Sequence, residues 1–122
     1  MEDDIKDWIS IAEDNLATAE ILYQNERFKD ACYYCQQVAE KALKAVQIAK
    51  LKRYDKIHFL PDLAESVKAP KSISIFAKRL TTYYINSRYP LPEHVAATEK
   101  ETEDAISGCR EVLEWAKSTL KL

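Results

Sequence analysis

Apolar residues recur at three- and four-residue steps through most of this chain, which is the spacing of one face of an α-helix. The sequence contains a single glycine, Gly108, whereas tight β-hairpin turns depend on glycine. The pattern therefore predicts an all-α protein, a compact antiparallel up-and-down bundle of four to five helices. Because the length is that of one domain, residues 1–122 are expected to form a single helical domain.

Five helical segments are expected, separated by polar or proline-containing breaks. The first two are long and joined by a short polar link, so they should form an antiparallel hairpin. The third is short, with Pro61 in its first turn, and Ser72 is the expected cap of the fourth. The expected ranges are about 3–23, 28–51, 58–67 and 72–88, with a last helix that ends near 120.

A break with two prolines, Pro90 and Pro92, separates the fourth and fifth helices. A residue before a proline is pushed out of the helical region, so the chain must turn here. The last helix then has two possible starts: Pro92 as its first residue, or Thr98 as the N-cap of a Thr-x-x-Glu capping box. The first places His94 in the opening helical turn, and the second places it in the preceding loop.

The N-terminal residues, Met1–Asp4, are acidic rather than basic and precede no long apolar stretch, so no signal peptide is expected. No apolar run approaches the roughly 18 residues that a membrane span requires. Three cysteines, an odd number, fit a reducing compartment when no export signal is read. We therefore expect a cytoplasmic protein that has no membrane partner.

The formal net charge of −2 conceals a basic middle. From Lys41 to Arg88 the chain carries eleven Lys or Arg and three Asp or Glu, a net charge of +8, whereas the flanking parts together carry −10. A basic segment in an otherwise acidic chain indicates an anionic ligand for that segment.

Arg88 and His94 stand on the two sides of the proline turn. A neutral imidazole can take a proton from a ribose 2′-hydroxyl, and a guanidinium can stabilise negative charge on a reacting phosphate. The alternative is structural, with Arg88 bound to the last carbonyls of its helix and His94 on the surface. Arg53 and His58 form a second pair of this kind, with four intervening residues, for which a structural role at a helix end is favoured.

Two features of the second helix have plain structural interpretations. Cys32 and Cys35 form a C-x-x-C within an apolar helical stripe, which favours core packing over redox chemistry. The cysteines and histidines are too few and too scattered for a zinc site, so neither metal nor cofactor is expected. The solvated or subunit-facing side of this helix is expected to consist of Gln36, Gln37, Glu40 and Lys41.

Three stretches together resemble one family, the HEPN (higher eukaryotes and prokaryotes nucleotide-binding) domains, in its small prokaryotic and archaeal branch. Residues 36–45, preceded by Asp30-Ala31-Cys32-Tyr33, resemble the family's second-helix signature. His58-Phe59-Leu60 followed by Leu63 resembles its His-x-Leu-x-x-Leu segment, and Arg88-Tyr89-Pro90 resembles its Arg-Tyr-Pro. The order of the three stretches matches over nearly the whole chain.

The resemblance implies a HEPN-like helical bundle that forms homodimers and binds RNA or a nucleotide. Many members are similar to metal-independent endoribonucleases, often toxins paired with a small nucleotidyltransferase-like partner. Their active pair is an arginine followed, after four to six residues, by a histidine, which assigns catalysis to Arg88 and His94 and 2′,3′-cyclic phosphate ends to the product. The alternative is a non-catalytic nucleotide-binding module or the helical subunit of a nucleotidyltransferase complex.

Further contacts to RNA or nucleotide are expected from the basic segment and from the residue after Arg88, since bases stack on exposed aromatic rings beside basic side chains. These predicted contacts are Arg53, Lys56, His58, Arg79 and Tyr89. Members whose tyrosine is modified by the partner carry it two residues after the histidine, where this chain has Ala96. This difference argues against that mode of control.

Overall fold

The computed structural model describes residues 2–53, 59–88 and 97–122, with backbone only at 86–88. Within these ranges every regular element is a helix, which confirms the all-α expectation. The two N-terminal helices agree with their predicted ranges to within one residue at each end. The elements are α1 (Glu2–Gln24), α2 (Phe28–Leu51), α3 (Leu60–Ser66), α4 (Lys71–Arg88) and α5 (Glu99–Leu120).

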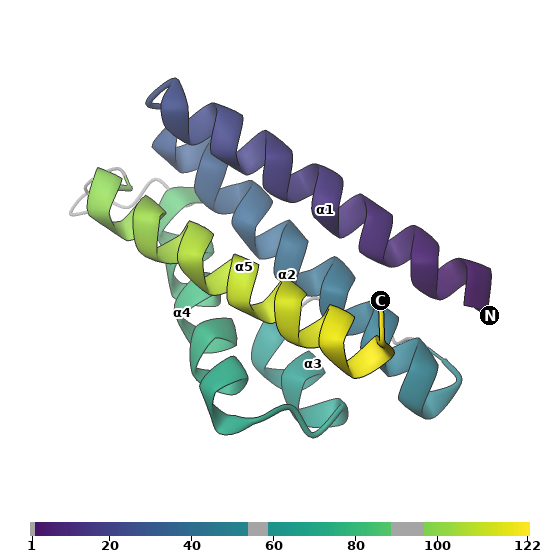
Figure 1. Ribbon diagram of the computed structural model, residues 1–122. Coiled ribbons are helices and arrows are strands. Elements are labelled where there is room, and N and C mark those ends of the chain that lie inside the picture. The colour runs from purple at the N-terminus through teal and green to yellow at the C-terminus, as the bar shows by residue number, and fades with distance from the viewer. Residues whose placement is uncertain (1, 54–58, 89–96) are drawn as a thin grey trace.

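The central element is α2, which packs against each of the other four helices. Figure 1 shows α1 and α2 lying antiparallel and side by side, with α5 along α2 and α4 steeply inclined to both. The antiparallel packing of α1 on α5 is held at the surface by two ion pairs, Glu13–Lys117 at 2.8 Å and Glu20–Arg110 at 2.9 Å. Successive long helices alternate in direction, as an up-and-down bundle requires.

The central position of α2 is seen in its side chains, most of which are buried. Its buried residues include Val38, Leu43 and Val46, none of which is accessible to solvent. A second buried row runs along one face at helical spacing and is polar: Gln36, Glu40, Lys44 and Gln47. The apolar periodicity predicted the core, and the polar row is the feature that it did not predict.

The helix ends explain where the chain turns. Thr98 caps α5: its hydroxyl accepts a hydrogen bond from the Glu101 N–H at 3.1 Å, and the Glu101 carboxylate accepts one from the Thr98 N–H at 3.1 Å. The prediction of Ser72 as a cap was wrong, because α4 begins one residue earlier. The carbonyl of Pro70 accepts the first helical N–H bonds instead, from Ile73 and Ser74.

The single glycine has a packing role in α5, where it faces α4. A Cβ atom at Gly108 would lie 3.1 Å from Cδ1 of Phe76, closer than carbon atoms normally approach. The glycine therefore lets the two helices pack together at this level. No helix in the described ranges has an apolar stretch long enough to cross a lipid bilayer.

Candidate functional site

Arg88 is the last residue of α4, so it lies where that helix meets the turn predicted from the two prolines. His94, Tyr89, Lys56 and His58 lie outside the described residues. The chain returns to the described part just before α5, whose first residue is Glu99. The Thr98 start of the last helix is thus confirmed, and His94 does not belong to the first turn of α5.

The end of α4 and the start of α5 are fastened to each other by a small polar cluster. The hydroxyl of Tyr83 donates a hydrogen bond to Oδ2 of Asp104 at 2.7 Å, and Nη1 of Arg79 lies 3.6 Å from Oδ1 of the same carboxylate. Partial burial, and then the hydrogen bond to Asp104, raise the pKa of the Tyr83 phenol to about 12. These contacts therefore hold the C-terminal part of α4 against the N-terminal part of α5, the two helices that flank residues 89–96.

Replacing Tyr83 with phenylalanine should lower the free energy of unfolding by about 0.5–1.5 kcal/mol near neutral pH, because it removes the hydrogen bond to Asp104. A pKa raised from 10 to about 12 means that this stabilisation is fully present below pH 10 and is lost as the pH rises through about 12. Urea unfolding of wild type and variant, near neutral pH and at about pH 11, measures the difference.

The same experiment has a matched control in Tyr23, whose hydroxyl donates to Glu103 at 2.6 Å and joins α1 rather than α4 to α5. The Tyr23→Phe change should leave the α4–α5 junction intact. A difference between wild type and Tyr83→Phe that stays constant up to about pH 11 contradicts the assignment.

A groove of about 310 Å³ lies between α2, α4 and the residue that precedes α3. Tyr84 and Ile85, from the last third of α4, line the groove. Phe59, the residue just before α3, also lines it. Gln36 and Glu40 are buried, with 4% and 2% of their surface exposed, yet both reach the groove. The complete lining is Gln36, Gln37, Glu40, Phe59, Thr81, Tyr84 and Ile85.

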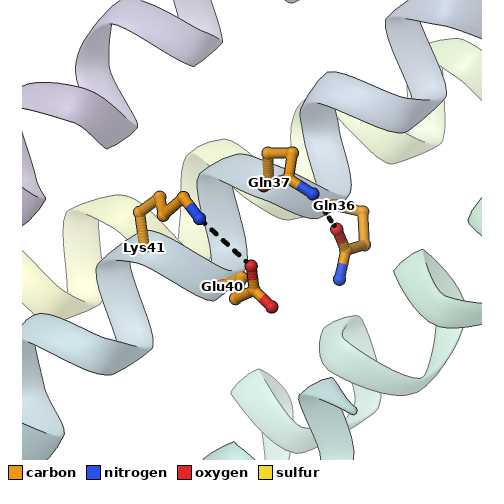
Figure 2. A network of polar contacts seen from close by, with 4 residues as sticks. All are labelled: Gln36, Gln37, Glu40 and Lys41. Carbon is orange, nitrogen blue, oxygen red and sulfur yellow. Dashed lines mark hydrogen bonds and ion pairs between the residues drawn. The ribbon is translucent and has the colours of Figure 1, made fainter. Parts of the chain in front are cut away.

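Figure 2 shows how the polar residues along this part of α2 contact one another. Nε2 of Gln37 donates a hydrogen bond to Oε1 of Gln36 at 3.0 Å. Nζ of Lys41 lies 3.3 Å from Oε2 of Glu40, while the second carboxylate oxygen points away from Lys41. The groove is thus lined by side-chain amides and a carboxylate that are partly oriented by their neighbours.

Positive charge lies directly beside this carboxylate. Lys41 and Lys44 each place their ammonium nitrogen over the ring of Trp8, at 5.4 and 5.6 Å from its centre. Lys44 is 4% exposed, and burial lowers its pKa, although the charge of Glu40 acts in the opposite direction. Glu40 and Lys44 are buried, and with the partly exposed Lys41 they form a row of ionisable groups beside the ring of Trp8.

Aromatic rings also gather where α4 ends against α2. The ring of Tyr33 lies 5.8 Å from that of Tyr84 and 5.2 Å from that of Tyr34, the latter in an edge-to-face arrangement. Of these three rings, Tyr84 lines the groove, four residues before Arg88 along α4.

Comparison with known proteins identifies the family. A model of the HEPN domain matches residues 5–119 of the sequence. The chain belongs to the HEPN domain family. The crystal structure of TT1696 from Thermus thermophilus is similar, with a TM-score of 0.83 and 32% identity over 93% of this chain and 96% of that one. No curated protein matches the sequence.

A second solved structure, ST0689, an archaeal HEPN homologue, has a TM-score of 0.79 and 25% identity, covering 94% of this chain and 96% of that one. The three stretches that resembled the family thus led to the right assignment, and the family supports a role connected with nucleotides or RNA.

The predicted outer side of the second helix is only partly exposed in this HEPN domain. Of the four residues expected on its solvated or subunit-facing side, Gln36 and Glu40 are buried, whereas Gln37 and Lys41 are partly exposed. The physical reason is that α2 packs against all four other helices, so part of its polar side also lies inside the bundle. The apolar residues that widen the predicted stripe, such as Leu43 and Val46, were the signal for a helix buried all round.

The described basic residues among the predicted RNA contacts lie in different places. Arg79 is on α4, half exposed, with its guanidinium 5.7 Å from the ring centre of Phe76. Arg53 follows the end of α2, and about 27 Å of helix separates that end from Tyr33 and the neighbouring end of α4. Arg79 therefore lies on the helix that ends in Arg88, whereas Arg53 lies at the far end of α2.

The cysteines pack in the core, as expected. Cys32, Cys35 and Cys109 are buried and form no disulfide with one another, and burial is the main cause that raises the pKa of Cys32. A hydrogen bond with Cys109, followed by burial, raises the pKa of Cys35. Thiols held in this protonated form are poor nucleophiles. Among the described residues, no group of three His, Cys, Asp or Glu side chains has the arrangement of a metal site.

Proposed function

We propose that this HEPN domain binds single-stranded RNA and cleaves it without a metal ion, with Arg88 and His94 as the catalytic pair. The observation that carries the proposal is the α4–α5 junction. Arg88 ends α4, and the hydrogen bond of Tyr83 to Asp104 joins α4 to α5, the two helices that flank residues 89–96. A rigid support of this kind favours catalysis, because rates fall steeply when reacting groups are misplaced.

In this reaction the imidazole of His94 takes the proton of a ribose 2′-hydroxyl, and the 2′-oxygen attacks the adjacent phosphorus. The bond from phosphorus to the 5′-oxygen breaks, and the leaving oxygen takes up a proton. Arg88 stabilises the negative charge that develops on the phosphoryl oxygens through its fork of N–H donors. The products are a 2′,3′-cyclic phosphate and a 5′-hydroxyl end.

The surroundings of the α4–α5 junction support an RNA ligand. Arg79 and Lys100 line a depression of about 400 Å³, together with Tyr83 and the carboxylates of Asp104 and Glu101. The two cations attract the phosphate backbone, and the two carboxylates offset part of that attraction. Tyr84 near the end of α4 and the neighbouring Tyr33 on α2 supply ring faces on which bases stack, each stacked base contributing about 1–3 kcal/mol to binding.

The test is cleavage of an end-labelled single-stranded RNA by the wild-type protein in excess chelator. We expect shortened products whose 3′ ends resist phosphatase until acid opens the cyclic phosphate. RNA binding without cleavage would instead support a non-catalytic HEPN module. Cleavage only after a divalent metal is added back would contradict the mechanism.

A further inference from the structure

Building on the proposed RNA binding, we infer that the groove between α2 and α4 receives one unstacked guanine base of the RNA strand and reads it with Glu40 and Gln36. Both side chains are buried and line the groove. The inference adds a base-recognition site to a domain whose proposed catalytic pair contacts only ribose and phosphate.

The groove is close to Arg88 along α4. Tyr84 and Ile85 line it, and Arg88 follows four residues after Tyr84, a rise of about 6 Å along the helix axis. That rise is about the distance between neighbouring nucleotides of an extended strand. A strand whose phosphate is bound at Arg88 therefore has a base within reach of the groove.

The polar groups fit the hydrogen-bonding edge of guanine. That edge presents two adjacent N–H donors, at N1 and at the 2-amino group, next to the O6 acceptor. A carboxylate has about four acceptor positions, so Glu40 can accept from these donors in addition to its existing contacts, of which the ion pair with Lys41 is one. The side-chain amide of Gln36 supplies N–H donors of the kind that O6 accepts. Adenine, cytosine and uracil each have an acceptor atom next to their donor. That acceptor would lie against the carboxylate, which cannot donate a hydrogen bond to it.

The shape of the groove agrees with a ligand of this size. Its volume of about 310 Å³ is at the lower end of the range for small-molecule sites, enough for one base and part of its ribose. Phe59 and Ile85 are 49% and 42% exposed, and with Tyr84 they offer apolar and aromatic surface to the ring of a base. Base-specific RNA readers combine stacking surfaces with polar groups that meet the base edge in this way.

The experiment measures fluorescence anisotropy of short labelled RNA strands that differ only in one central base, bound to the full chain carrying His94→Ala so that no strand is cut. We expect the guanine strand to bind at least about 10-fold more tightly than the adenine and uracil strands. Inosine, which lacks the 2-amino group, should lie between them. Glu40→Gln, which keeps the size of the side chain, should abolish the preference for guanine over inosine.

Ile85→Ala and Ile75→Ala form a matched pair, since both side chains lie on α4 with similar exposure, 42% and 44%, and only Ile85 lines the groove. Ile85→Ala should weaken binding of the guanine strand severalfold, whereas Ile75→Ala should not. If Glu40→Gln fails to fold, the ratio of guanine to inosine binding in the protein with native Glu40 decides the question.

The possible failures can be told apart. Equal affinity for all central bases overturns the guanine site and leaves the proposed RNA cleavage standing. Absence of binding to every strand overturns both. If Ile85→Ala instead lowers the molar mass in light scattering while base preference is unchanged, a second copy of the chain occupies the groove and the guanine assignment is wrong.

Discussion

Replacing Arg88 or His94 with alanine should lower the rate of RNA cleavage by about 10²- to 10⁴-fold at saturating RNA. The physical reason is that each group acts on the transition state. His94 removes the proton that makes the 2′-oxygen nucleophilic, and Arg88 neutralises charge that is absent from the bound substrate. The loss should therefore appear in kcat rather than in KM. Single-turnover rates in excess chelator measure it.

Two further variants sharpen this experiment. Arg88→Lys keeps the positive charge and loses the paired N–H donors, so it should recover only part of the rate. The double alanine variant should be scarcely slower than either single variant, because groups that act as a unit contribute non-additively.

Arg79→Ala is the matched control for charge, because Arg79 lies on the same helix and is half exposed beside Asp104. The Arg79→Ala change should weaken RNA binding and leave kcat nearly unchanged. The slope of the logarithm of the binding constant against the logarithm of the salt concentration should become shallower by about one. Equal cleavage rates for wild type, Arg88→Ala and His94→Ala would refute the catalytic assignment.

Replacing Leu43 with alanine should lower the free energy of unfolding by about 2–5 kcal/mol. Leu43 lies in the middle of α2 and is fully inaccessible to solvent, so its removal costs transfer free energy and leaves a cavity. Domains of this size are stable by only about 5–15 kcal/mol, so this change removes a large share of the total. Urea unfolding followed by circular dichroism measures the midpoint and slope.

Ile21→Ala is the control for this change, since Ile21 is 59% exposed on α1. Its effect on the free energy of unfolding should stay within about 0.5 kcal/mol. A loss below about 1 kcal/mol for Leu43→Ala would show that α2 is not the centre of the bundle.

Much of the helical framework was predictable because it depends on local interactions. The range of α2 follows from apolar periodicity between two polar breaks, and the start of α5 follows from a capping box that needs only Thr98 and Glu101. The prediction of Ser72 as the cap failed because α4 begins at Lys71, so Ser72 lies inside the first turn and the carbonyl of Pro70 accepts the first helical bonds. The exact first residue of a helix depends on backbone geometry that single-residue preferences do not contain.

The candidate site was predictable only in part. Sequence spacing singles out Arg88, and α4 indeed ends there. The polar cluster that joins Tyr83 to Asp104 links positions 21 residues apart, which no local pattern signals. Gln36 and Glu40 were expected on the solvated or subunit-facing side of the second helix, and the packing of the other helices buries them.

Local sequence therefore decided the helices, their order and most of the core, because periodicity, capping and proline act within a few residues of the chain. The packing of α1, α3, α4 and α5 around α2 decided the rest. It buried a glutamate and a glutamine at the edge of a groove, and it brought Tyr83 and Arg79 of α4 against Asp104 of α5. These outcomes depend on which helices meet, and that is a property of the tertiary structure alone.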